Sequence, residues 1–160
     1  MMTKETAEKL FDEILRYGVK SLVITGVEPL LNLDIVYMIL DFVSKNSIHI
    51  TMNSNLICLN DEVVLNLREL GLKNILTSLM GSCPEIYETV SGVKGSFEKA
   101  VSGISCALKN GFNVTCNMVT TKLNVHDIYS TAKFLNGTGV NGFCMTLACV
   151  PAVCNEPGRT

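Results

Sequence analysis

The sequence has no tryptophan, four prolines, two histidines and no strong excess of either charge, with a net charge of −2 over 160 residues. The scarcity of proline, together with 48% apolar residues, excludes a disordered chain. The near-balance of charge argues against a nucleic-acid binder, which normally carries a basic surplus. No apolar run approaches the roughly 18 residues of a membrane helix, so we expect no membrane partner. The amino terminus lacks an apolar signal-peptide core, and we therefore expect a cytoplasmic protein.

Cysteine, in contrast, is abundant. There are seven cysteines, an odd number, and without a secretion signal this pattern predicts reduced thiols rather than disulfides. Cys144, Cys149 and Cys154 recur every five residues near the carboxyl end. Thiolates there could bind an iron–sulfur group, but the spacing matches no common cluster pattern, and an isolated cysteine often only fills apolar space. Their role stays open at this point.

Apolar residues alternate between helical and strand periodicity along the chain. Strand starts fall about 30 residues apart, which is typical of βα units with parallel strands. We therefore predict a single α/β domain over residues 1–160, either an open doubly wound sheet or part of a (β/α)8 barrel. The predicted helices are 4–17, 33–45, 61–70, 84–90, 96–110 and 124–135, and the predicted strands are 21–25, 48–52, 74–79, 112–119 and 143–148.

The helix ends carry recognisable signals. Gly18 is expected to end the first helix in a left-handed conformation. Asn32 and Asn60 are expected to cap the second and third helices through their side chains. Asn124, with Asp127 three residues later, resembles a capping box for the last helix.

Polar residues follow the predicted strands at the points where ligands bind in both candidate folds. Gly26 lets a ligand approach the backbone, and Glu28 would project at the mouth of the sheet. Asn53 and Ser78 can hydrogen-bond a polar ligand, although taken alone the segment around Asn53 favours a simple turn. Asn117 lies in an apolar strand, so its amide needs a partner, which is either a ligand or a neighbouring strand.

Other kinds of site find no support in the sequence. It contains no G-x-G-x-x-G, no G-x-x-x-x-G-K-[ST] and no G-x-S-x-G, so nucleotide-phosphate loops and a serine-hydrolase elbow are not indicated. His49 and His126 have no cysteine or carboxylate at zinc-ligand spacing. We expect neither histidine to have a chemical role.

Taken together, the strand ends resemble the motifs of the radical S-adenosylmethionine (SAM) superfamily. The segment TGVEPLL resembles its GGEP motif, and TMNSNLI resembles the TNG segment that follows. The stretch that begins LTSLMGS and continues through GSFE to NVHD resembles the later motifs of the branches that modify molybdenum cofactor, haem and peptides (SPASM type). The likeness covers roughly residues 5–145.

The resemblance implies a fold, two cofactors and a set of site residues. The fold would be a partial, TIM-like (β/α) barrel with about five parallel strands, the first barrel strand missing. In that family a [4Fe–4S] cluster cleaves SAM to a 5′-deoxyadenosyl radical, and the protein orients and shields the cofactor. By resemblance, the SAM amino group would meet the backbone around Gly26, Val27 and Glu28. The methionine or ribose would lie along Asn53, Ser78 and Asn117, and the adenine near Val119.

The sequence also departs from the family pattern. The C-x-x-x-C-x-x-C motif that holds the cluster is absent, so we expect the cluster ligands to lie outside this chain. Val27, Met80 and Ser91 stand where the family has Gly, Asp and Arg. A Val adds a Cβ where a ligand would meet backbone, and the loss of an Arg removes a carboxylate partner. We expect that the 160-residue chain alone does not cleave SAM.

Three hypotheses follow. The chain could be the core of a radical SAM enzyme that modifies a peptide or a small molecule. It could instead be a non-catalytic relative that binds a partner, with a homodimer formed through the free edge of the sheet. It could also be an unrelated α/β barrel enzyme, for which Lys122 is the one candidate catalytic lysine at a strand end. The sequence does not identify the substrate.

Overall fold

The computed structural model describes residues 2–148 of the protein. Every helix and strand predicted from the sequence is present, and Gly18, with φ of 63°, ends the first helix as expected. No helix within residues 2–148 combines the length and hydropathy needed to cross a membrane. In chain order the elements are α1 (Lys4–Arg16), β1 (Ser21–Ile24), η1 (Pro29–Leu31), α2 (Leu33–Lys45), β2 (His49–Asn53), α3 (Asp61–Glu69), β3 (Asn74–Ser78), α4 (Pro84–Ser91), α5 (Ser96–Lys109), β4 (Asn113–Thr120), η2 (Val125–Asp127), α6 (Ile128–Thr138) and β5 (Gly142–Leu147).

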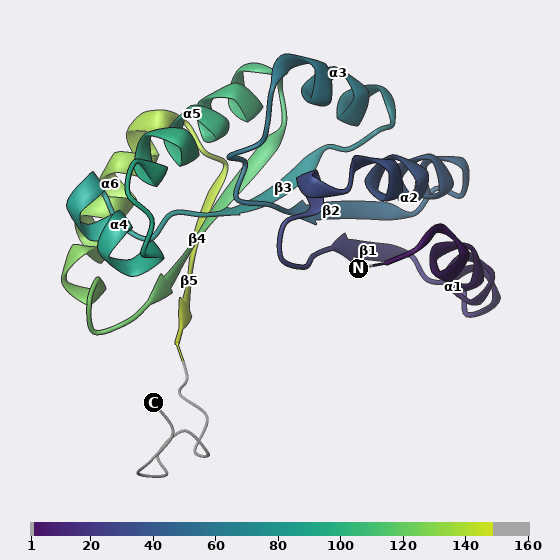
Figure 1. Ribbon diagram of the computed structural model, residues 1–160, viewed down its shortest axis with the longest axis horizontal. Coiled ribbons are helices and arrows are strands. Elements are labelled where there is room, and N and C mark those ends of the chain that lie inside the picture. The colour runs from purple at the N-terminus through teal and green to yellow at the C-terminus, as the bar shows by residue number, and fades with distance from the viewer. Residues whose placement is uncertain (1, 149–160) are drawn as a thin grey trace, which may run out of the picture.

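The five strands are all parallel and lie in the sheet in chain order, β1-β2-β3-β4-β5. A doubly wound sheet reverses its strand order at a switch point, and the sheet within residues 2–148 has no such reversal. The helices accordingly cover the outer side of a curved sheet (Figure 1). The fold is an α/β partial barrel of TIM type, and the doubly wound alternative is wrong.

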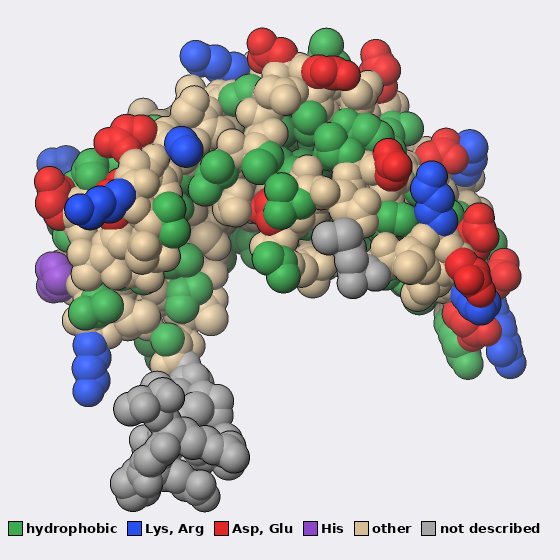
Figure 2. Space-filling model, viewed as in Figure 1, with side chains coloured by type: hydrophobic (Ala, Val, Ile, Leu, Met, Phe, Trp, Pro, Cys, Tyr) green, Lys and Arg blue, Asp and Glu red, His purple; other side chains and the backbone are tan. Residues whose placement is uncertain are grey.

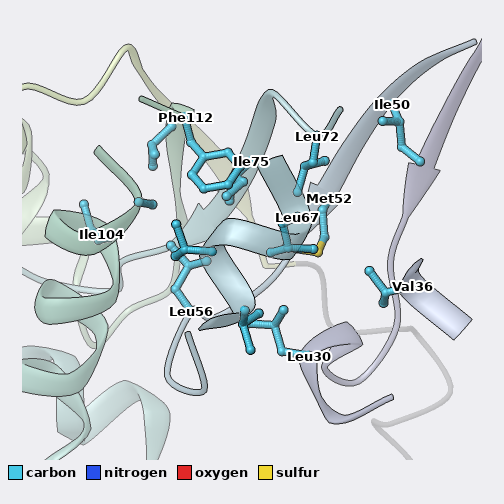
Figure 3. Packing of buried hydrophobic residues seen from close by; sticks show 14 of the residues in the cluster. Leu30, Val36, Ile50, Met52, Leu56, Leu67, Leu72, Ile75, Ile104 and Phe112 are labelled. Atoms are coloured by element: carbon cyan, nitrogen blue, oxygen red, sulfur yellow. The ribbon is translucent and has the colours of Figure 1, made fainter. Parts of the chain in front are cut away.

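The core lies between the sheet and its helices. Alternate strand residues, such as Ile50 and Met52 of β2, are buried against the helices. Figure 3 shows Val36 of α2, Leu67 of α3 and Ile104 of α5 as parts of the same buried cluster. Removal of these apolar side chains from water is the main force that holds the helices on this face.

The strand side chains on the opposite, concave face of the sheet are uncharged. None of the five strands contains Asp, Glu, Lys or Arg. Figure 2 shows the surface as an arch with an open hollow beneath it and with charged side chains along the outer side. The strands therefore present uncharged side chains to the hollow, some polar, such as Asn53 and Asn117, and some apolar, such as Val23.

One helix-capping prediction is confirmed and one is wrong. The Asn60 side chain accepts a hydrogen bond from Val63 N at 3.0 Å, as an N-cap should. Asn32 makes no such bond, because it follows η1 directly with φ of −138° and ψ of 65°, outside the extended conformation of a capping residue.

Two buried threonines provide a test of how polar groups in this core are satisfied. Thr77 is 2% exposed, and its Oγ1 has no hydrogen-bond partner. Thr131 is fully buried, but its Oγ1 donates to the Asp127 carboxylate at 3.0 Å. We expect Thr77→Val to raise the free energy of unfolding by about 1 kcal/mol, because it removes an unpaired buried hydroxyl.

Thr131→Val is the matched control. It should lower the free energy of unfolding by about 2 kcal/mol, because it removes a hydroxyl that donates to the Asp127 carboxylate. Urea denaturation of both variants checks the pair. Equal destabilisation by the two substitutions would show that shape, and not hydrogen bonding, decides the outcome.

Candidate functional site

The first two strand ends are joined by the Glu28 carboxylate. Its Oε1 accepts from Ser54 Oγ at 2.6 Å and from Leu30 N at 3.1 Å. Its Oε2 accepts from Asn55 N at 2.8 Å. The amides of Leu30 and Asn55 thus find their acceptor in this side chain. Glu28 connects the segments that follow β1 and β2.

Gly26 and Val27 form the turn after β1. Gly26 has φ of 156°, a conformation that L side chains rarely adopt. The Val27 side chain is fully exposed. Both residues, with Glu28, line a cavity of about 410 Å³ beside β1, whose other walls include Phe11 of α1 and Ile39 of α2.

The polar residues predicted on β2, β3 and β4 share the concave face. The strand register places Ser78 beside Asn117, and Asn117 beside Cys144 of β5. Asn53 of β2 pairs with Leu76 of β3, which faces the same side as Ser78 and lies two residues before it. Two residues further along β4, Val119 pairs with Thr146. The structure therefore gathers Asn53, Ser78, Asn117 and Val119 toward the carboxyl end of one concave surface, and Asn53 contacts Thr25, which precedes Gly26.

Asn53 has an unmet hydrogen-bonding capacity. Its Nδ2 donates weakly to Thr25 Oγ1 at 3.4 Å, while its Oδ1 is enclosed and has no partner. An unpaired buried acceptor costs roughly 1–3 kcal/mol. Asn53 is therefore a candidate partner for a ligand donor, such as an ammonium or a hydroxyl.

Asn117, the other amide, has its oxygen already occupied. The oxygen accepts from Thr146 Oγ1 at 2.9 Å and from Cys144 Sγ at 3.4 Å, so a neighbouring strand supplies the partners of Asn117 Oδ1. The amide nitrogen of the Asn117 side chain takes no part in these two bonds. Thr146 was not predicted as a site residue, because its position opposite Val119 depends on strand register, which spacing alone does not give.

Asn124 and Asp127 join the next pair of strand ends. The amide of Asn124, fully buried, donates to Met80 O and Val119 O, both at 3.0 Å. The Asp127 carboxylate accepts from Ser82 N at 2.6 Å and from Ser82 Oγ at 2.8 Å. The predicted capping box is wrong, since neither side chain caps a helix. Both instead hold the loop after β3 against the loop after β4.

The described cysteines and histidines form no metal site. Within residues 2–148 no group of three His, Cys, Asp or Glu side chains is placed to hold a metal ion, so these residues do not fit a [4Fe–4S] cluster. Burial, with a smaller effect from Cys144, raises the pKa of the Cys116 thiol to about 12, which keeps it protonated at neutral pH. Cys149 and Cys154 lie outside the described residues.

Together, the singly wound parallel sheet and the polar residues at its carboxyl edge define a partial (β/α) barrel with a candidate site at the strand ends. The family model of the radical SAM superfamily matches residues 1–135. The chain therefore belongs to the radical SAM superfamily, and the alternative of an unrelated α/β barrel enzyme is wrong.

Two relatives illustrate the sequence likeness. An AdoMet-dependent heme synthase of Methanosarcina barkeri is 27% identical over 138 residues, which are 86% of this chain and 39% of the relative. A probable GTP 3′,8-cyclase of Thermococcus kodakarensis is 32% identical over 139 residues, or 86% of this chain and 44% of the relative. The chain thus spans about two-fifths of the length of these curated relatives.

Solved structures share the fold. The structure of native anSMEcpe with bound AdoMet and Kp18Cys peptide matches with a TM-score of 0.82 at 17% identity, over 100% of this chain and 46% of that one. Streptococcus suis SuiB bound to S-adenosylmethionine matches with a TM-score of 0.74 at 21% identity, over 91% of this chain and 34% of that one. At these identities the likeness shows the fold alone.

The Asp127 contacts predict a pH dependence of stability. Burial alone would raise the pKa of Asp127, but hydrogen bonds from Ser82, Thr131 and Ser130 outweigh it and lower the pKa. A folded-state pKa below the unfolded value of about 3.9 stabilises the protein above that pH, and the stabilisation is lost as the pH falls through the folded-state pKa.

Asp127→Asn should therefore lower the free energy of unfolding by about 2 kcal/mol at pH 7, and by progressively less as the pH falls below 4. Urea denaturation of wild type and variant across this pH range measures the difference. The exposed Asp12 of α1 provides the control, and Asp12→Asn should change stability by less than about 0.5 kcal/mol. If the stability difference between wild type and Asp127→Asn stayed constant down to pH 2, the lowered pKa of Asp127 would be contradicted.

Proposed function

We propose that this chain is the SAM-binding core of a radical SAM enzyme, which cleaves SAM at a [4Fe–4S] cluster to modify a substrate through a 5′-deoxyadenosyl radical. The observation that carries the proposal is the gathering of Gly26, Asn53, Ser78 and Asn117 at one carboxyl edge in a chain of this superfamily. When bound, the cluster and SAM would supply the radical chemistry, and this chain would bind and orient SAM.

Each site residue has a role that its geometry can support. The Gly26–Glu28 backbone would receive the SAM amino group, and the unpaired Asn53 Oδ1 would accept from that ammonium or from a ribose hydroxyl. Ser78 and the free amino group of Asn117 would act as donors along the methionine or ribose. Val119, on the same face beyond Asn117, would border the adenine.

The cluster ligands would come from sequence other than residues 2–148, since no suitable set lies there. The substrate would be a peptide or a small molecule, in line with the peptide bound to anSMEcpe and with the haem- and GTP-modifying relatives. A nucleic-acid partner is not proposed, because the chain has no basic surplus.

A non-catalytic relative is the second candidate. The departures from the family motifs at Val27, Met80 and Ser91 favour it. Such a protein would keep the barrel and bind a partner or a second copy along the free edge of β1. The intact mass of the protein from its native host separates the two candidates, because an enzyme of this kind must exceed 17.4 kDa to include cluster ligands.

Asn117 and Asn113 form a matched pair for testing SAM binding. Both lie on β4 and face the concave side, four residues apart, but Asn113 is at the amino end, where it donates to Asn74. In the longest polypeptide that the native gene encodes, Asn117→Ala should weaken SAM binding roughly tenfold, because one hydrogen bond is lost. Asn113→Ala should leave it unchanged within about twofold. Anaerobic calorimetry with SAM measures both, and equal effects would place the site elsewhere.

The 160-residue chain alone should produce no 5′-deoxyadenosine from SAM under anaerobic reducing conditions, even after iron and sulfide reconstitution. Its described residues provide no cluster site, and without a cluster SAM cannot be cleaved reductively. Chromatography of the reaction mixture tests this. Formation of 5′-deoxyadenosine by the purified chain would contradict this prediction.

A further inference from the structure

The acceptor capacity of Glu28 is largely used by the protein itself. A carboxylate offers about four acceptor positions. Three of them are taken by Leu30 N, Ser54 Oγ and Asn55 N, at 3.1, 2.6 and 2.8 Å. The side chain is half-buried, so water does not fully compete for these contacts. The carboxylate therefore has little capacity left for a ligand.

The same network continues beyond Glu28. Ser54 Oγ, which donates to Glu28, also accepts from Leu56 N at 3.0 Å. Leu56 is buried and has φ of 60°, a left-handed conformation that costs a non-glycine residue roughly 1–2 kcal/mol. The Leu56 carbonyl lies against Gly103 of α5, where a Cβ would collide with it. The strained backbone after β2 is thus held from two sides.

We propose that Glu28 is a positioning residue whose carboxylate fixes the ends of β1 and β2 relative to each other. It acts through Ser54 and Asn55, and so places the Asn53 side chain and the Gly26 backbone, instead of contacting the ligand with its carboxylate. This inference rests on the proposed function, because it says how the proposed SAM contacts are held. The structural part of the inference can be measured without any ligand.

Glu28→Gln gives a residue-specific test. Glutamine keeps one oxygen, which can still serve the two donors at the Oε1 position. Its amino group then meets Asn55 N–H, which loses its acceptor. Hydrogen exchange of the Asn55 amide, followed by NMR on the 160-residue chain, should accelerate roughly tenfold, while the Leu30 amide should change little.

Ser54 provides the second arm. Ser54→Ala removes both the donor to Glu28 and the acceptor of Leu56 N, so the Leu56 amide should exchange roughly tenfold faster. Ser54→Thr keeps the hydroxyl and should restore protection. Glu88→Gln is the matched control, since Glu88 Oε1 accepts only from Gly95 N among its described contacts and glutamine can keep that bond.

SAM affinity of the longest native polypeptide is then measured for the same variants. Glu28→Gln and Ser54→Ala should weaken it by similar factors, and Ser54→Thr and Glu88→Gln should not. Unchanged exchange at Asn55 in Glu28→Gln overturns the proposal. So does a loss of affinity in Glu28→Gln alone, because Glu28 would then be a direct ligand. Absence of SAM binding in the wild type would refute the proposed function, while the exchange data would still decide the positioning role.

Discussion

The placement of the helices on one side of the parallel sheet is the constraint on which the rest of this structure depends. Because βα units follow one another in a single direction, the strands keep chain order and their carboxyl ends meet along one edge. Burial of the outer face uses the apolar half of each strand, as Ile50 and Met52 illustrate. The inner face is then free to carry polar residues without cost to the core.

Short polar links between neighbouring strand ends shape that edge. Glu28 joins the segments after β1 and β2, Asn124 and Asp127 join those after β3 and β4, and Asn117 joins β4 to Thr146 of β5. Each link supplies partners for groups that the strand ladder leaves unpaired. The loops that would contact SAM are therefore held in place by side chains whose hydrogen bonds are made within the protein.

The departures from the family motifs fit this fold without strain. Val27 extends into solvent, and Met80 packs at the border of the core while its carbonyl accepts from Asn124. Ser91 lies within 3.2 Å of Ser96 Oγ and helps to close the turn between α4 and α5. Each substitution removes a family feature while the local structure stays satisfied, so the fold by itself does not require the family residues at these positions.

The sequence by itself determined the elements, their order and the family. Apolar periodicity and about 30-residue spacing are local signals, and they located all five strands and placed the Asn60 cap correctly. Tertiary structure decided what Asn124 and Asp127 do, because their spacing suits a capping box, while two of their partners, Met80 and Ser82, are more than 40 residues away. It also brought Thr146 to Asn117 and Ser54 to Glu28, since strand register and loop contacts are set by packing between distant segments and leave no trace in local spacing.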